Sequence, residues 1–123
     1  SPPASLNSLG FECKSWPSAV KDFKDDPEIV SVYYEEIIQL VKNCSGATNV
    51  YVFDHTRRET GVQGLNASKG GKAAPVPRVH CDYTATGAPK RLQQLGEQGI
   101  HSRLKNRQLT PDEVASLAAG RFA

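Results

Sequence analysis

The longest stretch of helical periodicity lies between Asp26 and Gly46, and it constrains the fold more than any other segment. A helix start is indicated by Asp26, Pro27 and Glu28, which provide an N-cap side chain, a proline preset for the first turn and a carboxylate near the positive end of the helix dipole. The glycine at 46 is typical of a helix end. Apolar residues recur at three- and four-residue intervals and form one face, made of Ile29, Val30, Tyr33, Ile37, Leu40 and Val41. We therefore predict an amphipathic helix with one face against a core.

The segments around this helix predict an α+β fold. Residues 1–25 lack sustained periodicity and contain three prolines, so they are interpreted as an N-terminal arm that packs onto the core. Residues 49–55 and 78–83 are rich in β-branched and aromatic side chains and are predicted to be strands. Between them, residues 59–77 form a long glycine-rich loop, which is a candidate lid.

Two more helices are predicted in the last third of the chain. Pro89 opens one, and Thr110 and Glu113 have the spacing of a capping box that begins the other. The basic stretch 90–107 has little aromatic interleaving, so it is interpreted as a solvated helical face rather than a nucleic-acid interface.

Composition excludes several classes of protein. The 123 residues suit one modest domain, and a net charge of +2 does not call for nucleic acid as a partner. No apolar stretch approaches the ~20 residues needed to cross a bilayer, so no membrane partner is expected. The three cysteines, Cys13, Cys44 and Cys81, lack the spacing of a disulfide framework or a structural zinc site, which favours the cytoplasm. The start at Ser1 and the lack of methionine predict a piece of a longer chain.

The chemistry of the chain is concentrated at His80 and Asp82. Side chains two positions apart on a strand project from the same face. An imidazole beside a carboxylate forms two thirds of the two-histidine, one-carboxylate triad that holds iron(II) with open coordination positions. The alternative is a solvated pair in which the two side chains bond only to each other.

Two arginines follow the first predicted strand directly. Arg57 and Arg58 lie where a strand end meets a loop, and guanidinium groups there can grip a carboxylate. They are candidates for binding an acidic substrate or cosubstrate. The alternative is a pair of solvated arginines.

Three blocks of sequence, taken in order, resemble a known family. They are FDHTRR at 53–58, VHCDYT at 79–84 and GAPKRL at 87–92. The chain over about 45–123 resembles the hydroxylase/desaturase family of fungal secondary metabolism, which includes gibberellin desaturase and relatives of the cephem methoxylase component. Residues 1–44 match that family only in general character.

The resemblance implies an enzyme that depends on iron(II) and 2-oxoglutarate and hydroxylates or desaturates a small molecule. It implies a double-stranded β-helix, or jelly roll, with flanking helices, of which residues 26–123 would be the N-terminal portion. His80 and Asp82 would be the first two iron ligands, and Thr84 joins Arg57 and Arg58 as a candidate contact for substrate or cosubstrate.

The third iron ligand is not evident from the sequence. In the family, the distal histidine and the basic residue for 2-oxoglutarate lie on later strands, beyond the position of Ala123. His55 and His101 are the other histidines here, and neither is assigned as a ligand. A missing C-terminal segment or a second chain would have to provide the remaining ligand and strands, so this chain alone is predicted to be inactive.

A function of a different class explains the truncated end. The chain would be a noncatalytic half-barrel whose exposed strand edges pair with another chain, since unpaired edges are natural sites of strand addition. A solution monomer would argue against it.

Overall fold

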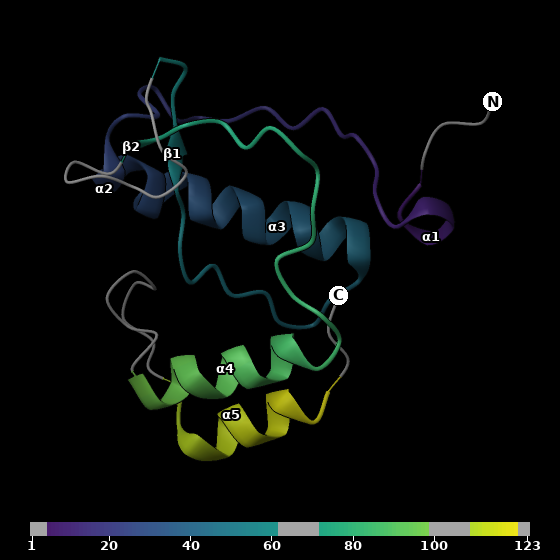
Figure 1. The fold of residues 1–123 in the computed structure, drawn as a ribbon. Helices are drawn as coiled ribbons and strands as arrows, with labels where there is room; N and C mark the ends of the chain where they lie inside the picture. Colours follow the sequence, from purple (N-terminus) through teal and green to yellow (C-terminus); the bar gives the residue numbers. More distant parts are fainter. Residues whose placement is uncertain (1–4, 62–71, 99–108, 121–123) are drawn as a thin grey trace. The chain divides into compact units, whose positions relative to one another are not determined.

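The structure is a computed structural model that describes residues 5–61, 72–98 and 109–120 (Figure 1). The chain divides into two compact units, which are Ser1–Val52 and Phe53–Ala123. Each unit has its own packing and is described by itself.

The first unit is built on the predicted long helix. Its helical turns run without a break through α2 (Asp26–Glu28), η1 (Ile29–Tyr33) and α3 (Tyr34–Ser45). The helix ends at Gly46, whose φ of 70° is the left-handed conformation that glycine adopts without a Cβ penalty. The predicted helix is therefore confirmed, except that Asp25 and not Asp26 occupies the N-cap position.

The π-helical turn η1 changes which residues face the core. The backbone N–H of Tyr34 bonds to the carbonyl of Ile29, five residues back, so the helix phase shifts by one residue at this turn. As a result, Ile29 and Tyr34 are the buried residues of the helix, while Val41 is 38% exposed. The apolar face predicted with uniform periodicity is wrong at these positions, because it left out Tyr34 and included Val41.

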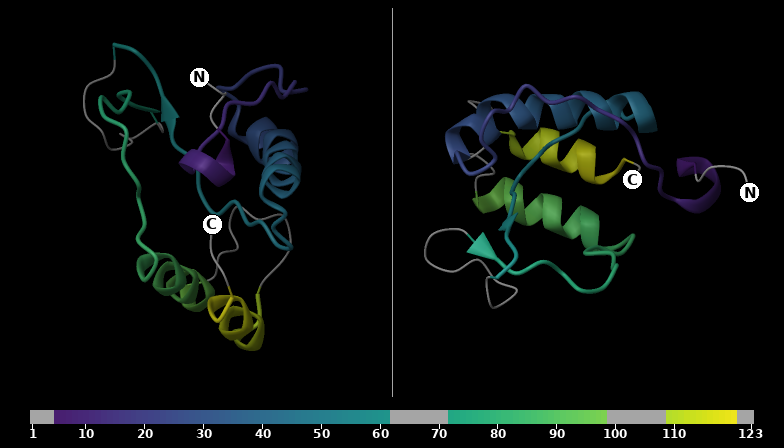
Figure 2. Two further views of the ribbon diagram at one scale, coloured as in Figure 1. Left: turned by 90° about the vertical axis from the view of Figure 1, so that its right-hand side faces the viewer. Right: turned by 90° about the horizontal axis from the view of Figure 1, so that it is seen from above.

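Two glutamates of the long helix hold the arm beside it (Figures 1 and 2). The carboxylate of Glu36 accepts hydrogen bonds from the Ser18 hydroxyl at 2.6 Å and the Ala19 N–H at 2.7 Å. The carboxylate of Glu28 accepts from the backbone N–H groups of residues 21–22, both at 2.9 Å. These bonds join the arm to the helix, and the arm contains a short helix, α1 (Leu6–Leu9), that was not predicted.

The Glu28 contact is expected to be sensitive to acid. The two N–H donors stabilise the carboxylate and lower the pKa of Glu28 below its ordinary value. The contact is therefore complete above the ordinary pKa of a glutamate and is lost as the pH falls through the lowered pKa. The amide signals of Lys21 and Asp22 in a proton–nitrogen spectrum should shift with that titration, and Glu28→Ala should place them at their acid positions already at neutral pH. Unchanged signals in that variant would contradict the contact.

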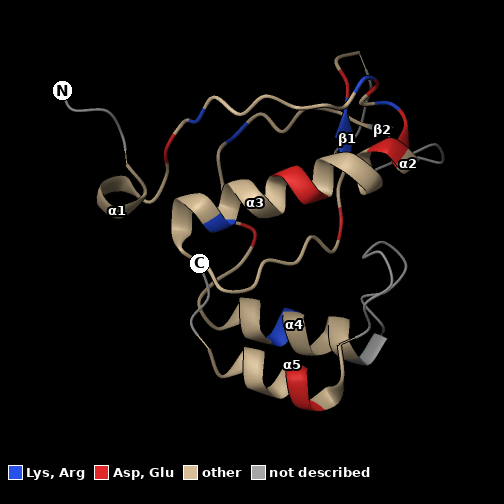
Figure 3. Cartoon of the chain, turned by 180° about the vertical axis from the view of Figure 1, so that it is seen from behind, with Lys and Arg blue, Asp and Glu red and all other residues tan. Residues whose placement is uncertain are grey.

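Charges on the long helix complement its dipole. The acidic residues Asp26 and Glu28 lie in its first turn and the basic Lys42 in its last (Figure 3). Negative charge near the N-terminus and positive charge near the C-terminus stabilise a helix. In the part of the chain that the structure describes, no helix is both long enough and apolar enough to cross a membrane.

The second unit contains a two-stranded parallel sheet and two helices. The sheet pairs β1 (Arg57–Arg58) with β2 (Lys72–Ala73), with Arg57 opposite Lys72. The helices are α4 (Gly87–Gln98) and α5 (Pro111–Ala118), and they lie side by side in every view (Figure 2). Both helices were predicted, and the capping box is present: Thr110 Oγ1 accepts from the Glu113 N–H at 3.2 Å.

The two predicted strands are not formed in the described residues. The segments 49–55 and 78–83 have no regular secondary structure, and β1 begins only at Arg57. A strand needs a hydrogen-bonded neighbour, and the only ladder among the described residues is the short one between β1 and β2. The jelly roll stays a prediction. Most of the candidate lid, residues 62–71, lies outside the described residues.

A glycine allows the close packing of α4 and α5. A Cβ on Gly96 would come within 2.5 Å of a methyl carbon of Val114, which is closer than real Cβ contacts. Val114 is buried, as is Leu109 just before the capping box. The helix pair therefore requires a residue without a side chain at position 96.

Candidate metal site

The side chains of His80 and Asp82 lie against each other. The distance from His80 Nε2 to Asp82 Oδ1 is 3.0 Å, and the side chains are 52% and 75% exposed. The segment is not a regular strand, but the residues are still on the same side of the chain, as their spacing predicted. Their exposure leaves room for further ligands around both atoms.

The other ring nitrogen of His80 forms a hydrogen bond with the backbone. Nδ1 is 3.0 Å from the carbonyl oxygen of Arg78, and because a carbonyl only accepts, Nδ1 carries a proton. This bond raises the pKa of His80 above its ordinary value, and the negative charge of Asp82 adds to the rise. The positive charge of Arg58 opposes it. In the neutral ring, the lone pair of Nε2 therefore points at the carboxylate.

This geometry fits a bound divalent cation. A metal-ligating histidine commonly donates its second ring N–H to a backbone carbonyl, which orients the ring. Two ligand atoms about 2.1 Å from an ion and at right angles are about 3.0 Å apart, which is the separation of Nε2 and Oδ1 here. Without a cation, the same separation suits a proton shared between imidazolium and carboxylate.

An aromatic contact joins the first two sequence blocks. The rings of Phe53 and Tyr83 meet edge to face, with centroids 6.4 Å apart and an angle of 68°. The charge of Arg58 also acts on His80. The second unit thus brings residues of 53–58 close to residues of 79–84, although the blocks are about twenty residues apart in the sequence.

The two candidate arginines lie on β1. Arg58 Nη1 donates to the carbonyl of Ala74 at 2.7 Å, which ties β1 to the chain after β2. Arg57 is half-buried and Arg58 is exposed. Arg58 therefore has a structural contact and also contributes positive charge near the candidate metal pair.

Thr84 caps the start of α4. Its Oγ1 accepts a hydrogen bond from the Gly87 N–H at 3.0 Å, and its carbonyl accepts from the N–H groups of Gly87 and Ala88. Satisfying free N–H groups at a helix start is the usual role of threonine at such a position. Thr84 thus has a structural contact, and its role toward substrate or cosubstrate stays a prediction.

Among the described residues, a third protein ligand is not found beside the pair. Within residues 5–61, 72–98 and 109–120, no group of three or more His, Cys, Asp or Glu side chains is arranged to hold a metal ion. His55 is half-buried and lies in the first block, where its backbone N–H bonds to Asp54. His101 lies outside the described residues.

Sequence reasoning overlooked Arg91. It was included in a solvated basic face, but its guanidinium carbon lies 5.6 Å from the centre of the Phe53 ring and the residue is half-buried. For Arg91 the prediction of a solvated side chain is wrong, because Phe53 covers it. The next basic residues of that face, Arg103, Lys105 and Arg107, lie outside the described residues.

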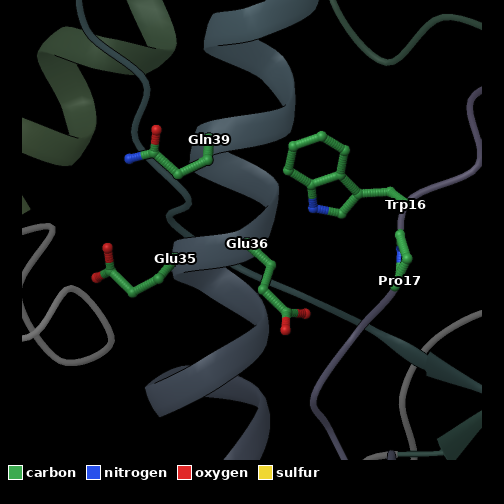
Figure 4. Close-up of a pocket in the computed structure, with 5 residues that line it drawn as sticks. All are labelled: Trp16, Pro17, Glu35, Glu36 and Gln39. Carbon is green, nitrogen blue, oxygen red and sulfur yellow. The ribbon is translucent and has the colours of Figure 1, made fainter.

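The first unit has an open depression between the arm and α3. The arm brings Trp16 and Pro17 beside the helix, from which Glu35, Glu36 and Gln39 project (Figure 4). Glu36 already accepts hydrogen bonds from the arm. The depression belongs to the first unit and contains no residue of the candidate metal site.

Comparison with known proteins places the chain in a family. A family model described as "Oxidoreductase/YMDC permease-like domain" matches residues 2–110. Among curated proteins, the chain is 38% identical over 93 residues to "Oxidoreductase AN1597" of Emericella nidulans. It is 33% identical over 100 residues to "Hydroxylase/desaturase efuI" of Hormonema carpetanum. A third relative, 29% identical over 104 residues, is "Alpha-ketoglutarate-dependent dioxygenase phiK" of a fungal species.

The chain belongs to this oxidoreductase family, and its relatives include fungal proteins named as a hydroxylase/desaturase and an α-ketoglutarate-dependent dioxygenase. The resemblance drawn from the sequence blocks is thereby confirmed. The matches cover 83%, 72% and 74% of this chain but only 38%, 32% and 34% of the phiK, AN1597 and efuI proteins. The chain thus spans about a third of the length of these relatives. No solved structure gives a significant match.

Proposed function

We propose that this chain contributes His80 and Asp82 to the iron(II) site of a 2-oxoglutarate-dependent oxygenase that hydroxylates or desaturates a small molecule. The observation that carries the proposal is the 3.0 Å approach of Nε2 and Oδ1, with Nδ1 held by the Arg78 carbonyl. The names of the fungal relatives support the class of reaction.

The residues of this chain have two tasks in such a site. His80 presents a lone pair whose direction is set by its bond to Arg78, and Asp82 presents a carboxylate oxygen beside it. When bound, iron(II) supplies the activation of dioxygen, with 2-oxoglutarate oxidised to succinate and carbon dioxide. Protonation of His80 competes with metal binding, so binding weakens as the pH falls. Because the pKa of His80 is raised, this loss begins at a higher pH than for an ordinary histidine.

The third ligand has to be a residue other than these two. It lies either among the residues that the structure does not describe or in a longer or second chain. Where the third ligand comes from a longer or second chain, this chain alone binds a divalent ion weakly, through His80 and Asp82, and does not turn over a substrate.

Binding of Mn²⁺ by this chain tests the metal assignment. Mn²⁺ prefers oxygen and nitrogen ligands and broadens nearby nuclear magnetic resonances, so it should broaden the ring signals of His80 at low occupancy. Asp82→Ala should remove the effect at His80. His55→Ala is the matched control and should leave it unchanged. Equal broadening at His80 in wild type and Asp82→Ala would refute the shared site.

We also propose that Arg57 and Arg58 attract an acidic substrate or cosubstrate, because Arg58 contributes positive charge at His80. In a protein that turns over, Arg58→Gln should raise the KM for the acidic reactant several-fold and leave kcat nearly unchanged, since screened charge near a site affects encounter and binding more than chemistry. The KM should depend less on salt in the variant. A KM with an unaltered salt dependence would discard the role.

One observation favours the noncatalytic assembly module. Residues 75–83 are exposed and have no ladder partner in the described part of the chain, and the Val79 side chain is fully exposed at 105%. Such an exposed segment could pair with a strand of another chain. Sedimentation of this chain over a concentration series tests the module. A monomer throughout would argue against pairing between copies of the chain, and dimers would support it.

A further inference from the structure

The guanidinium group of Arg91, on α4, packs against an aromatic ring. The guanidinium carbon lies 5.6 Å from the centroid of the Phe53 ring, a distance at which the ring face attracts the cation. Phe53 in turn contacts Tyr83 edge to face. The aromatic pair thus restricts the planar head group of Arg91, which would otherwise move freely on its long stem.

Among the described residues, one donor of this group is left unused. Arg91 Nε is buried from solvent and has no hydrogen-bond partner among the described residues. Buried N–H donors are nearly always paired, because a donor that leaves water without a partner loses free energy. An orphan donor on a guanidinium therefore indicates a missing acceptor.

The chemistry of the missing acceptor follows from the shape of the donor. A guanidinium presents parallel N–H groups that match the two oxygens of a carboxylate. The guanidinium carbon lies over the ring of Phe53, and a carboxylate can approach in the plane of the guanidinium, as it does in a bidentate pair. The neighbouring Lys90 is exposed.

The contacts of Arg91 lead to the candidate metal pair. Phe53 touches Tyr83, and Tyr83 is bonded through the backbone to Asp82. A carboxylate bound at Arg91 would thus be held by a group whose support comes from both sequence blocks.

We propose that Arg91 binds a carboxylate of a small-molecule ligand, with Phe53 holding the guanidinium in place. The ligand is the substrate or the 2-oxo acid cosubstrate of the proposed oxygenase, and only this assignment rests on the proposed function. Arg91 is distinct from Arg57 and Arg58, since its acceptor is absent while Arg58 already donates to Ala74.

Side-chain nuclear magnetic resonance of this chain, with chelator present to remove metal, tests the proposal. The Nε–H signal of Arg91 is followed during titration with succinate, 2-oxoglutarate, the neutral succinamide and inorganic phosphate. The signal is expected to move saturably with the dicarboxylates and to stay in place with succinamide. No movement with either dicarboxylate, or tighter binding of phosphate than of both, would overturn the carboxylate assignment.

Variants separate the specific contact from general charge. Arg91→Gln should weaken dicarboxylate binding roughly tenfold or more, and Arg91→Lys, which keeps the charge but not the fork, should weaken it clearly. Lys90→Gln is the matched control and should change binding less than about twofold. If Lys90→Gln and Arg91→Gln weakened dicarboxylate binding equally, the effect would be one of net charge, and the proposal would be overturned. The wild-type titration stands even where a variant fails to fold.

The same titrations identify the ligand and keep the two proposals apart. Tighter binding of 2-oxoglutarate than of succinate assigns the site to the cosubstrate, and equal binding assigns it to a carboxylate of the substrate; both support a carboxylate site. Because no metal is present, failure of Mn²⁺ binding at His80 leaves this result standing, and failure here leaves the metal result standing.

Discussion

Alanine at His80 or at Asp82 is expected to abolish iron-dependent formation of succinate from 2-oxoglutarate in the full-length protein. Each change removes an atom of the pair whose Nε2 and Oδ1 lie 3.0 Å apart. Loss of a group that merely orients a metal ligand costs about 10–100-fold in affinity or activity, and loss of a ligand itself costs more. Succinate release with and without added iron(II) is the measurement, and iron content of the purified variants is the second readout.

A control at the intervening position distinguishes ligation from general damage to the segment. Cys81 is exposed and lies between the two residues, so Cys81→Ser should keep both iron content and succinate formation. A second test concerns orientation. Asp82→Glu keeps the charge but moves the carboxylate oxygens, so its activity should be below that of the wild type. Full activity of His80→Ala would sink the ligand assignment.

Gly96→Ala is expected to destabilise the second unit by about 1–3 kcal/mol, the usual cost of forcing an extra carbon into a packed contact. The added Cβ would lie 2.5 Å from a Val114 methyl carbon, and Val114 is buried. Alanine favours a helix over glycine by about 1 kcal/mol, so propensity alone predicts the opposite sign. Urea unfolding followed by circular dichroism should therefore show a lower midpoint for the variant.

A compensating change at the other helix makes the test specific. Val114→Ala removes the methyl groups that the new Cβ meets, so Gly96→Ala should be much less damaging in the Val114→Ala background. Gln94→Ala is the control on the exposed side of α4 and should alter stability little. A Gly96→Ala protein as stable as wild type would mean that the two helices do not pack through this contact.

Local signals in the sequence predicted the helices well, because the groups that start and end a helix are neighbours along the chain. The Thr110–Glu113 capping box and the left-handed Gly46 both occur where the sequence placed them. The closeness of His80 and Asp82 was equally predictable, since side chains two positions apart can contact each other even in an irregular extended segment. The role of either residue in metal binding stays a prediction.

The strands and the buried faces were less predictable, because they depend on distant partners. Residues 49–55 have the composition of a strand but no ladder partner in the described part of the chain. Uniform periodicity could not anticipate the π-helical turn, after which Tyr34, a residue outside the predicted apolar face, is buried. The burial of Arg91 by Phe53 had no signal in the sequence, since the two residues are far apart along the chain.

For this protein, then, the sequence by itself determined the presence of the three predicted helices, the pairing of His80 with Asp82 and the family resemblance, because each depends on residues within a few positions or on short ordered blocks. Only the tertiary structure decided that Phe53 meets Tyr83, that Gly96 admits Val114 and that Arg91 has a buried donor without a partner. Those contacts join residues separated by at least eighteen positions, and their formation depends on packing that no local propensity encodes.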